Sequence, residues 1–511
     1  MQSEQRLRLA LPFKKNSVLR HLLTERFPHV MPGHEEIHAT LYDTPGHMLH
    51  KHGISLLLRQ NSSGWLQTVQ FPAKGVSGFE SETRPVNTTW LPGPVQHKRL
   101  RRFFESPTIA GALQPLVQMD IRRTSWHVQD AEGNIFLIHL DSGHLHQGPH
   151  RTRINEIGME RVQGSSHAFY QLAITLSATL PVKVEPLSLI ERSYALVTPV
   201  QARLPVKAMP VHVDAGMPPI QALQQIAHHA LRHFQKNLPG VLEENDPEYI
   251  HQARVALRRL ISAQKVFAPI SNEDSWLVVA VPLKEMTTLL GLVRDVDVFL
   301  AETLPAFAQT GHVSSEAVQQ LAEALTLQCR QYKQTARAAL DAALNCRFQA
   351  GFLSWISEPT AVTDHKPPNL KHFSRKVLTQ RLATVSRLAS QWDELDEVQR
   401  HSLRKRIKTL RYAIEFFAPI YPRKAVQHYL AKLQDLQQIL GEMNDRCVAR
   451  AVLTSLPRQT AELADTVQRC AAWLEESAHI HHAPFLAAFA ALAETPAFWQ
   501  ITRGAHRQKG K

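Results

Sequence analysis

A pattern of basic and apolar residues recurs in this chain after an interval of 150 residues. The stretch LLGLVRD at 289–295 is answered by ILGEMND at 439–445 in that same register. The basic residues that repeat are His251, Arg254, Arg258, His401, Arg404 and Lys408. Several matches at one offset indicate an internal duplication. We therefore predict that this part of the chain consists of two similar units.

Both copies have helical periodicity, because their basic residues fall on one face at about 100° per residue. Leu257, Leu260 and Phe267 fall on the other face, which a core would take. Apolar spacing predicts helices over 220–236, 249–267, 277–304, 315–344, 371–388, 397–417, 425–440, 445–456, 461–479 and 483–501. Prolines near 359–368 separate two predicted halves, 220–358 and 369–500, and 501–511 forms a basic tail.

The first 198 residues have a different character. Short alternating runs such as ISLLLRQ, WLQTVQF and IFLIHLD have the length of strands and are separated by turn residues. Helices are expected near 15–27 and 166–180. Five prolines within 199–219 predict a linker between two domains. The predicted fold class is therefore α+β with two domains: an antiparallel sheet, with closure into a barrel as an expectation, and an all-α duplicated bundle.

Charge limits the partners. Lysine and arginine exceed the acidic residues by 13, which favours polyanions such as nucleic acid, polyphosphate or phosphorylated small molecules. No apolar run is long enough for a signal peptide or a membrane span. The four cysteines are interpreted as buried thiols of a reducing compartment. These features predict a cytoplasmic protein without a membrane partner, with polyphosphate granules as one expected location.

The N-terminal motifs resemble the CYTH family of triphosphate tunnel enzymes. The resemblance rests on Glu4-x-x-x-Arg8, LYDTPGHMLHKHGISLLLR, LDSG at 140–143 and EIGME at 156–160. It implies an eight-stranded barrel in which cations grip triphosphate and glutamates hold Mg²⁺ or Mn²⁺ for hydrolysis. It implies metal candidates Glu4, Asp141, Glu156 and Glu160, and triphosphate candidates Arg8, Arg59, Arg122, Arg123 and Arg192. Glu80 and Glu82 are further retained carboxylates.

Several positions depart from that family pattern. Arg6 stands where the second carboxylate of the opening signature belongs, and Gly158 replaces the middle carboxylate of the late one. Leu57, Gln70 and Leu189 stand where phosphate-binding cations are expected. Replacing a metal-binding glutamate by arginine removes a ligand and adds a repelling charge. We therefore expect weak or absent triphosphatase activity, while an active metal-dependent inorganic triphosphatase remains the alternative.

The duplicated helices resemble the conserved-histidine α-helical family, CHAD. HQARVALRRL, LGLVRDVDV, LRKRIKTLRYAIEFF and LGEMND carry this resemblance. It implies two four-helix halves related by a pseudo-twofold axis, and an association with inorganic polyphosphate. The candidate polyphosphate-binding residues are His251, Arg254, Arg258, Arg259, Lys265, Arg337, Arg375, His401, Arg404, Lys408 and Arg411.

Two interpretations of these residues stay open. A repeated basic stripe favours a shared anion groove, whereas His251 and His401 are equally consistent with a structural role between the halves. Asp295, Asp297 and Asp445 are expected to hold arginines in place. Nucleic acid is the rival partner, but the stripes lack the interleaved aromatic residues that stack on bases. The sequence therefore predicts a polyphosphate-binding protein with inorganic triphosphate as a second candidate ligand.

Overall fold

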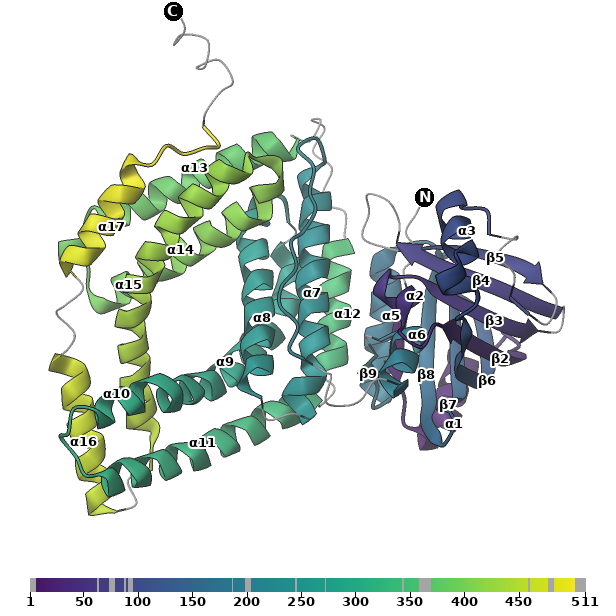
Figure 1. The fold of residues 1–511 in the computed structure, drawn as a ribbon, viewed down its shortest axis with the longest axis horizontal. Helices are drawn as coiled ribbons and strands as arrows, with labels where there is room; N and C mark the ends of the chain where they lie inside the picture. Colours follow the sequence, from purple (N-terminus) through teal and green to yellow (C-terminus); the bar gives the residue numbers. More distant parts are fainter. Residues whose placement is uncertain are drawn as a thin grey trace, which may run out of the picture. The chain divides into compact units, whose positions relative to one another are not determined.

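The computed structural model describes residues 6–61, 64–72, 79–86, 89–90, 95–185, 187–197, 204–243, 246–271, 273–341, 344–357, 369–457, 460–476 and 482–500. The chain divides into two compact units (Figure 1). The first, which we call the sheet unit, comprises Met1–Leu204 with Asn345–Ala350; the second, the helical unit, comprises Pro205–Leu344 and Gly351–Lys511.

One antiparallel sheet of nine strands forms the centre of the sheet unit. Its strands are β1 (Arg6–Ala10), β2 (Gly33–Asp43), β3 (Ser55–Asn61), β4 (Gly64–Pro72), β5 (Phe79–Val86), β6 (Gln114–Gln129), β7 (Ile135–Gln147), β8 (His150–Gln163) and β9 (Lys183–Val184). Their spatial order is β5-β4-β3-β2-β6-β7-β8-β1-β9. The predicted antiparallel sheet is confirmed, but among the described strands β5 and β9 are edges and their pairing does not close a barrel.

Side chains alternate between two faces of the central strands. On one face, Phe136 of β7 packs against α5 (Ser166–Thr179), with its ring 6.0 Å from that of Phe169. On the other face lies α6 (Leu189–Val197), whose Tyr194 is buried in an apolar cluster with Met119 and Ile154. Residues two apart on a strand share a face, so Ile154 and Glu156 point to the same side. Part of the face predicted to be a charged tunnel wall is therefore apolar core.

Short helices complete this unit. They are η1 (Phe13–Lys15), α1 (Asn16–Arg26), α2 (Met48–Lys51), α3 (Lys98–Glu105) and α4 (Pro107–Ala110). The helices predicted near 15–27 and 166–180 are confirmed as α1 and α5. Leu100 and Phe104 of α3 pack with Leu56 and Val69 in a second apolar cluster, so α3 covers the strands at the β5 edge.

Helices make up the second unit. They are α7 (Pro219–Glu243), α8 (Pro247–Phe267), η3 (Ala268–Ile270), α9 (Glu273–Val298), the π-helical η4 (Phe299–Thr303), α10 (Leu304–Ala308), α11 (Ser315–Asp341), α12 (Leu344–Ser357), α13 (Leu370–Ala389), η5 (Trp392–Glu394), α14 (Glu397–Phe417), η6 (Ala418–Ile420), α15 (Arg423–Ser455), α16 (Ala461–Glu476) and α17 (His482–Glu494). None of these described helices, nor any in the sheet unit, is long and apolar enough to cross a bilayer.

The duplication predicted from the sequence is visible in matching helix boundaries. α8 and α14 each have 21 residues and begin 150 positions apart. Asp246 and Asp396 cap their N-termini with side-chain oxygens, and each helix ends in the same Ala-Pro-Ile 3₁₀ turn. The rings of Phe267 and Phe417 lie 5.7 Å apart. The two copies therefore meet along equivalent helices.

The segment predicted as a linker is attached to the helical unit where it is described. Residues 204–218 form no helix or strand. The backbone N–H of Val206 donates to Asn237 Oδ1 at 2.9 Å, and Asn237 Nδ2 donates to the Val206 carbonyl at 2.9 Å. Val211 and Val213 are buried. This part of the segment packs against the helices instead of extending freely.

Candidate functional sites

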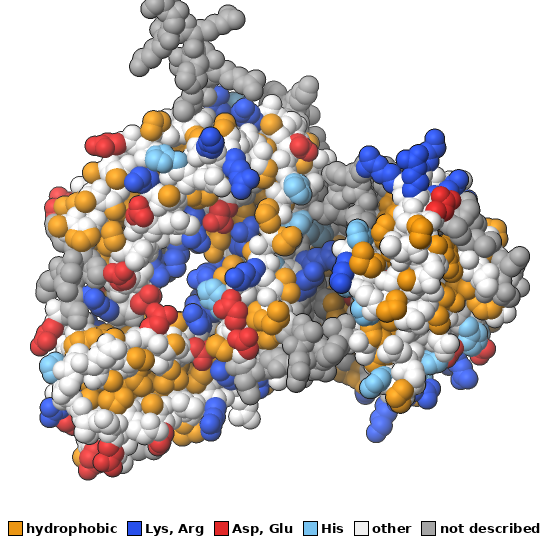
Figure 2. Space-filling view, viewed as in Figure 1, with side chains coloured by type: hydrophobic (Ala, Val, Ile, Leu, Met, Phe, Trp, Pro, Cys, Tyr) orange, Lys and Arg blue, Asp and Glu red, His pale blue; other side chains and the backbone are white. Residues whose placement is uncertain are grey.

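Basic side chains of the two copies converge between α8 and α14. Two adjoining pockets share Arg258, Arg404 and Lys408. The first, which we call the paired-histidine pocket, has a volume of about 300 Å³ and is also lined by His251, Arg254, Arg294, Asp295, His401, Asn444 and Asp445. The second, the glutamine pocket, has about 330 Å³ and is also lined by Arg411, Tyr412, Gln434, Gln437 and Gln438. In Figure 2 the helical unit is hollowed, with Lys and Arg atoms along the rim.

Matched ion pairs hold two of these arginines. Arg254 Nη1 lies 3.7 Å from Asp295 Oδ1, and Arg404 Nη2 lies 3.7 Å from Asp445 Oδ1. Arg254 also donates to the Leu290 carbonyl at 3.1 Å. The carboxylates thus orient the guanidinium groups at the pocket wall without neutralising every cation around them.

The two histidines at the equivalent positions have different neighbours. His401 Nδ1 lies 3.0 Å from Asn444 Oδ1, whereas the residue equivalent to Asn444 in the first copy is Arg294. Burial is the main cause that lowers the pKa of both His251 and His401, and neighbouring cations lower it further. Both imidazoles therefore favour the neutral form, which can donate or accept a hydrogen bond.

Lys408 is the most perturbed cation of the site. Burial, followed by repulsion from Arg404 and Arg258, lowers its pKa to about 7. The Nε atoms of Arg258 and Arg404 are buried and find no hydrogen-bond partner in the described part of the chain. Buried donors without partners are costly. The pockets therefore present a surplus of positive charge that an oxyanion would offset.

Four of the predicted cations do not line either pocket. Arg259 Nη1 lies 3.3 Å from Glu415 Oε2, and Arg337 Nε donates to the Val241 carbonyl at 3.1 Å. Lys265 and Arg375 are also outside the two linings. Arg411 lines the glutamine pocket while its Nε lies 3.3 Å from Glu415. Of the predicted set, seven residues are thus brought together: His251, Arg254, Arg258, His401, Arg404, Lys408 and Arg411.

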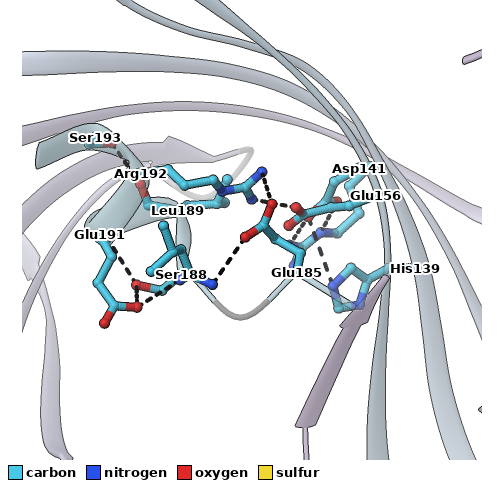
Figure 3. Close-up of polar contacts among 11 residues, drawn as sticks. His139, Asp141, Glu156, Glu185, Ser188, Leu189, Glu191, Arg192 and Ser193 are labelled. Atoms are coloured by element: carbon cyan, nitrogen blue, oxygen red, sulfur yellow. Dashed lines mark hydrogen bonds and ion pairs between the residues drawn. The ribbon is translucent and has the colours of Figure 1, made fainter. Parts of the chain in front are cut away.

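In the sheet unit, buried carboxylates are engaged by arginines (Figure 3). Asp141 of β7 accepts two hydrogen bonds of 2.7 Å from Arg123 of β6. Glu156 of β8 accepts from Arg192 of α6, which also lies 3.7 Å from Glu185. The side chains of Asp141 and Glu156 are 1% and 2% exposed. Charge-assisted pairs of this kind satisfy a carboxylate internally.

The other predicted tunnel residues are dispersed. Arg6 lies 3.3 Å from Glu160, and Arg122 lies 3.6 Å from Glu36 with its side chain 86% exposed. Arg8 shares the region of Glu156 and Arg192, and burial is the main cause that lowers its pKa. Arg59 on β3 is opposite Ala39 of β2. Glu4, and the side chains of Glu80 and Glu82, lie outside the described residues.

A histidine occupies the place of the missing central carboxylate. Gly158 of β8 is paired with His139 of β7, and any side chain at position 158 would overlap the His139 imidazole. His139 Nε2 lies 3.9 Å from Asp141 Oδ2. Burial, then the charge of Arg123, lowers the pKa of His139 to about 4. A neutral ring therefore fills the space that a metal-binding glutamate would need.

The described residues of the sheet unit do not fit a Mg²⁺ or Mn²⁺ site. Such ions require several oxygen ligands, but Asp141, Glu156 and Glu160 are each paired with arginine. No group of three or more histidine, cysteine or acidic side chains in the described ranges is arranged to hold a metal. The expectation of a damaged metal site stays a prediction, because the candidate ligand Glu4 lies outside the described residues.

Several residues that line the pockets were not predicted from the sequence. Gln434, Gln437 and Gln438 of α15 line the glutamine pocket, and Val298, Phe299 and Thr303 line the paired-histidine pocket. Uncharged residues carried no signal of a site. Arg294 and Asn444 could have been found, since they occupy equivalent positions in the repeated motifs.

Comparison with known proteins identifies a domain family in each part of the chain. Residues 9–194 match the CYTH domain and residues 225–454 match the CHAD domain. The chain is therefore a CYTH–CHAD protein. The CHAD domain from the plant Ricinus communis is similar at 29% identity and a TM-score of 0.52, covering 57% of this chain and 98% of that one. PptA from Streptomyces chartreusis has 16% identity and a TM-score of 0.42, covering 54% and 100%.

One curated relative is similar to part of the sequence. The protein "Inorganic triphosphatase" of Haemophilus influenzae is 28% identical over 160 residues, which are 31% of this chain and 45% of that protein. The match thus spans less than half the length of the relative. It establishes a distant relationship.

Proposed function

We propose that the protein binds inorganic polyphosphate where the two copies of the repeat within its CHAD domain meet. The observation that carries this proposal is the convergence of Arg258, Arg404 and Lys408 on two adjoining pockets. A polyphosphate chain supplies repeated oxyanions to the cations that line these pockets. The association of the CHAD family with inorganic polyphosphate supports the same ligand.

Recognition would depend on charge and hydrogen bonds, with no requirement for a sequence of bases. Arginine can contact phosphate with two donors, while lysine acts as a point charge. Gln434, Gln437 and Gln438 add amide donors at the second pocket. Tyr412 is the one aromatic side chain of that lining. Base stacking therefore receives little support, and polyphosphate is favoured over nucleic acid.

We propose further that the CYTH domain is a tunnel-type fold that has lost most of its metal chemistry. The pairs Asp141–Arg123 and Glu156–Arg192, together with His139 above Gly158, support this view. An arginine that neutralises a carboxylate competes with a metal ion for the same oxygens. Closure of the barrel remains part of this proposal, whereas Mg²⁺ or Mn²⁺ dependence belongs to the active-enzyme alternative.

The second candidate is an active metal-dependent inorganic triphosphatase whose CHAD domain brings it to phosphate polymers. The similarity to the Haemophilus influenzae protein favours it. Phosphate release from inorganic triphosphate, measured with Mg²⁺ or Mn²⁺ and with chelator, separates the two proposals. Our proposal expects no metal-dependent release together with salt-sensitive polyphosphate binding. Metal-dependent turnover would favour the enzyme.

The proposed ligand also fits the expected location. A polyphosphate-binding protein would act in the cytoplasm, at granules of the polymer. Its binding should weaken as salt rises, because bound counterions are released when cations replace them. DNA offered in competition with polyphosphate tests the nucleic-acid alternative: displacement by DNA at equal phosphate concentration would contradict the proposed preference.

A further inference from the structure

The duplicated basic stripes end differently in the two copies. On α8, Lys265 follows Arg258 by seven residues, and on α14 Glu415 follows Lys408 by seven residues. A separation of seven residues returns to nearly the same face of a helix, about 10 Å further along its axis. The two equivalent positions therefore carry opposite charges beyond the same shared pockets.

Glu415 neutralises its surroundings. It lies 3.3 Å from Arg259 Nη1 and 3.3 Å from Arg411 Nε, so one carboxylate is shared by two arginines from the two copies. The positions equivalent to Arg259 and Glu415 are Thr409 and Lys265. The equivalent contact, between positions 409 and 265, is thus left without its carboxylate.

At the position equivalent to Glu415, four cations lie near one another instead. The charges that act on Lys265 of α8 are those of Arg381 on α13 and of Lys405 and Arg406 on α14. Arg381 donates through Nη2 to the carbonyl of Lys265, while its Nε is buried without a hydrogen-bond partner in the described residues. No ion pair joins these four side chains to a carboxylate within the described ranges.

The electrostatic environment agrees with this geometry. Burial lowers the pKa of Lys265, and the charged groups that lower it further are Lys405, Arg381 and Arg406. Burial and the charge of Arg406 lower the pKa of Arg381. Mutually repelling cations at a helix boundary are stabilised when an anion lies among them.

We propose that Lys265, Arg381, Lys405 and Arg406 form a second phosphate-binding subsite that holds the polyphosphate chain where it extends beyond the central pockets. The inference rests on the proposed function, because the same polymer must occupy both places. Glu415 stands at the equivalent position in the other copy and would repel phosphate, so the polymer is held beyond the pockets at the Lys265 end only.

Chain length provides the test, because a short anion can fill the central pockets without reaching the subsite. Inorganic triphosphate and long-chain polyphosphate are titrated into the full chain, into Lys265→Glu and into Lys405→Glu. Both changed lysines reach solvent, although neighbouring side chains partly cover Lys265, so folding should persist. We expect each variant to lose about fivefold or more in affinity for the long chain, and little for triphosphate.

Lys98→Glu is the matched control, because it makes the same charge change at an exposed lysine of the sheet unit. The inference is overturned if Lys265→Glu binds the long chain as Lys98→Glu does, or if it loses triphosphate and long-chain affinity equally. Lys408→Met tests the central pockets separately. If that variant binds both probes like the wild type, the proposed function itself fails.

Discussion

Arg404 approaches Asp445 at 3.7 Å, the separation that Arg254 keeps from Asp295 at the equivalent positions. Both carboxylates line the paired-histidine pocket, and burial together with Asp445 raises the pKa of Asp295. The pairs orient the arginines but also place negative charge where we propose that phosphate binds. Their geometry therefore reflects a compromise between arginine orientation and anion affinity.

Removing one of these carboxylates should strengthen polyphosphate binding. Asp445→Asn keeps the shape of the side chain while it releases the charge of Arg404, so we expect affinity to rise about three- to tenfold. Isothermal titration calorimetry measures this change. Asp465→Asn on α16 is the control, since Asp465 pairs with Arg469 outside both pockets. Weaker binding by Asp445→Asn would mean that arginine orientation dominates.

Binding should be linked to proton uptake by Lys408. Its pKa of about 7 in the free protein should rise beside a polyanion. Above pH 7 the neutral amine must then gain a proton on binding, so affinity should fall as pH increases from about 7 to 9. Calorimetry in buffers of different ionisation enthalpy reports this uptake.

Lys408→Arg provides the control for that linkage. A guanidinium stays protonated over this range, so the pH dependence should become shallower in the variant. Equal pH dependence in both proteins would assign the linked proton to another group, such as His251 or His401.

The Lys408 side chain should also lower the free energy of unfolding when no ligand is bound. The pKa of its amine is lower in the folded protein than its ordinary value of 10.5, so the unfolded chain binds more protons between about pH 7 and 10.5. Lys408→Met should raise the free energy of unfolding by at least about 1 kcal/mol at pH 7. This gain should shrink as pH approaches 10. Chemical denaturation across pH measures it, and a loss of stability at pH 7 would contradict the assignment.

Because His139 packs on Gly158, we expect the effects of mutations at these two positions on stability to depend on each other. Gly158→Ala should lower the free energy of unfolding by about 1–3 kcal/mol, because its methyl group overlaps the buried imidazole. In a His139→Ala background the same change should cost less. A double-mutant cycle by denaturation tests this coupling, and additive effects would show that the ring moves aside freely.

The same contact affects attempts to restore the metal site. Arg6→Glu with Gly158→Glu returns two carboxylates to the positions of the CYTH pattern, but the second change meets His139. We therefore expect metal-dependent phosphate release to require His139→Ala as well. The double variant without His139→Ala provides the comparison, and its equal activity would contradict this steric explanation.

The repeated pattern predicted much of the helical domain because helix boundaries and their caps are local features. Glu397–Phe417 was predicted as a helix and is observed with those bounds. The predicted break between 440 and 445 was wrong, since α15 runs through Gly441 from Arg423 to Ser455. Tertiary packing tolerates a glycine within a long helix. Cys447 is likewise exposed although it was expected to be buried, whereas the other three cysteines are buried.

Long-range contacts in the sheet unit were harder to predict. The alternation of β3, β4 and β7 indicated strands, but β2 and β6 were not recognised, and α6 was missed. Their pairing brings Arg123 to Asp141, and α6 brings Arg192 to Glu156. A list of retained carboxylates and arginines did not reveal that they neutralise one another. Convergence depends on register and helix placement, which spacing along the chain does not encode.

Binding of long-chain polyphosphate across a salt series tests the central claim most directly, when the wild type is compared with an Arg258→Gln, Lys408→Met double variant. The account predicts that the variant loses at least about tenfold in affinity. The slope of log affinity against log salt should also become less steep by roughly 1 to 2. Unchanged affinity and slope, in a variant that remains folded, would contradict the claim that these pockets hold the polymer.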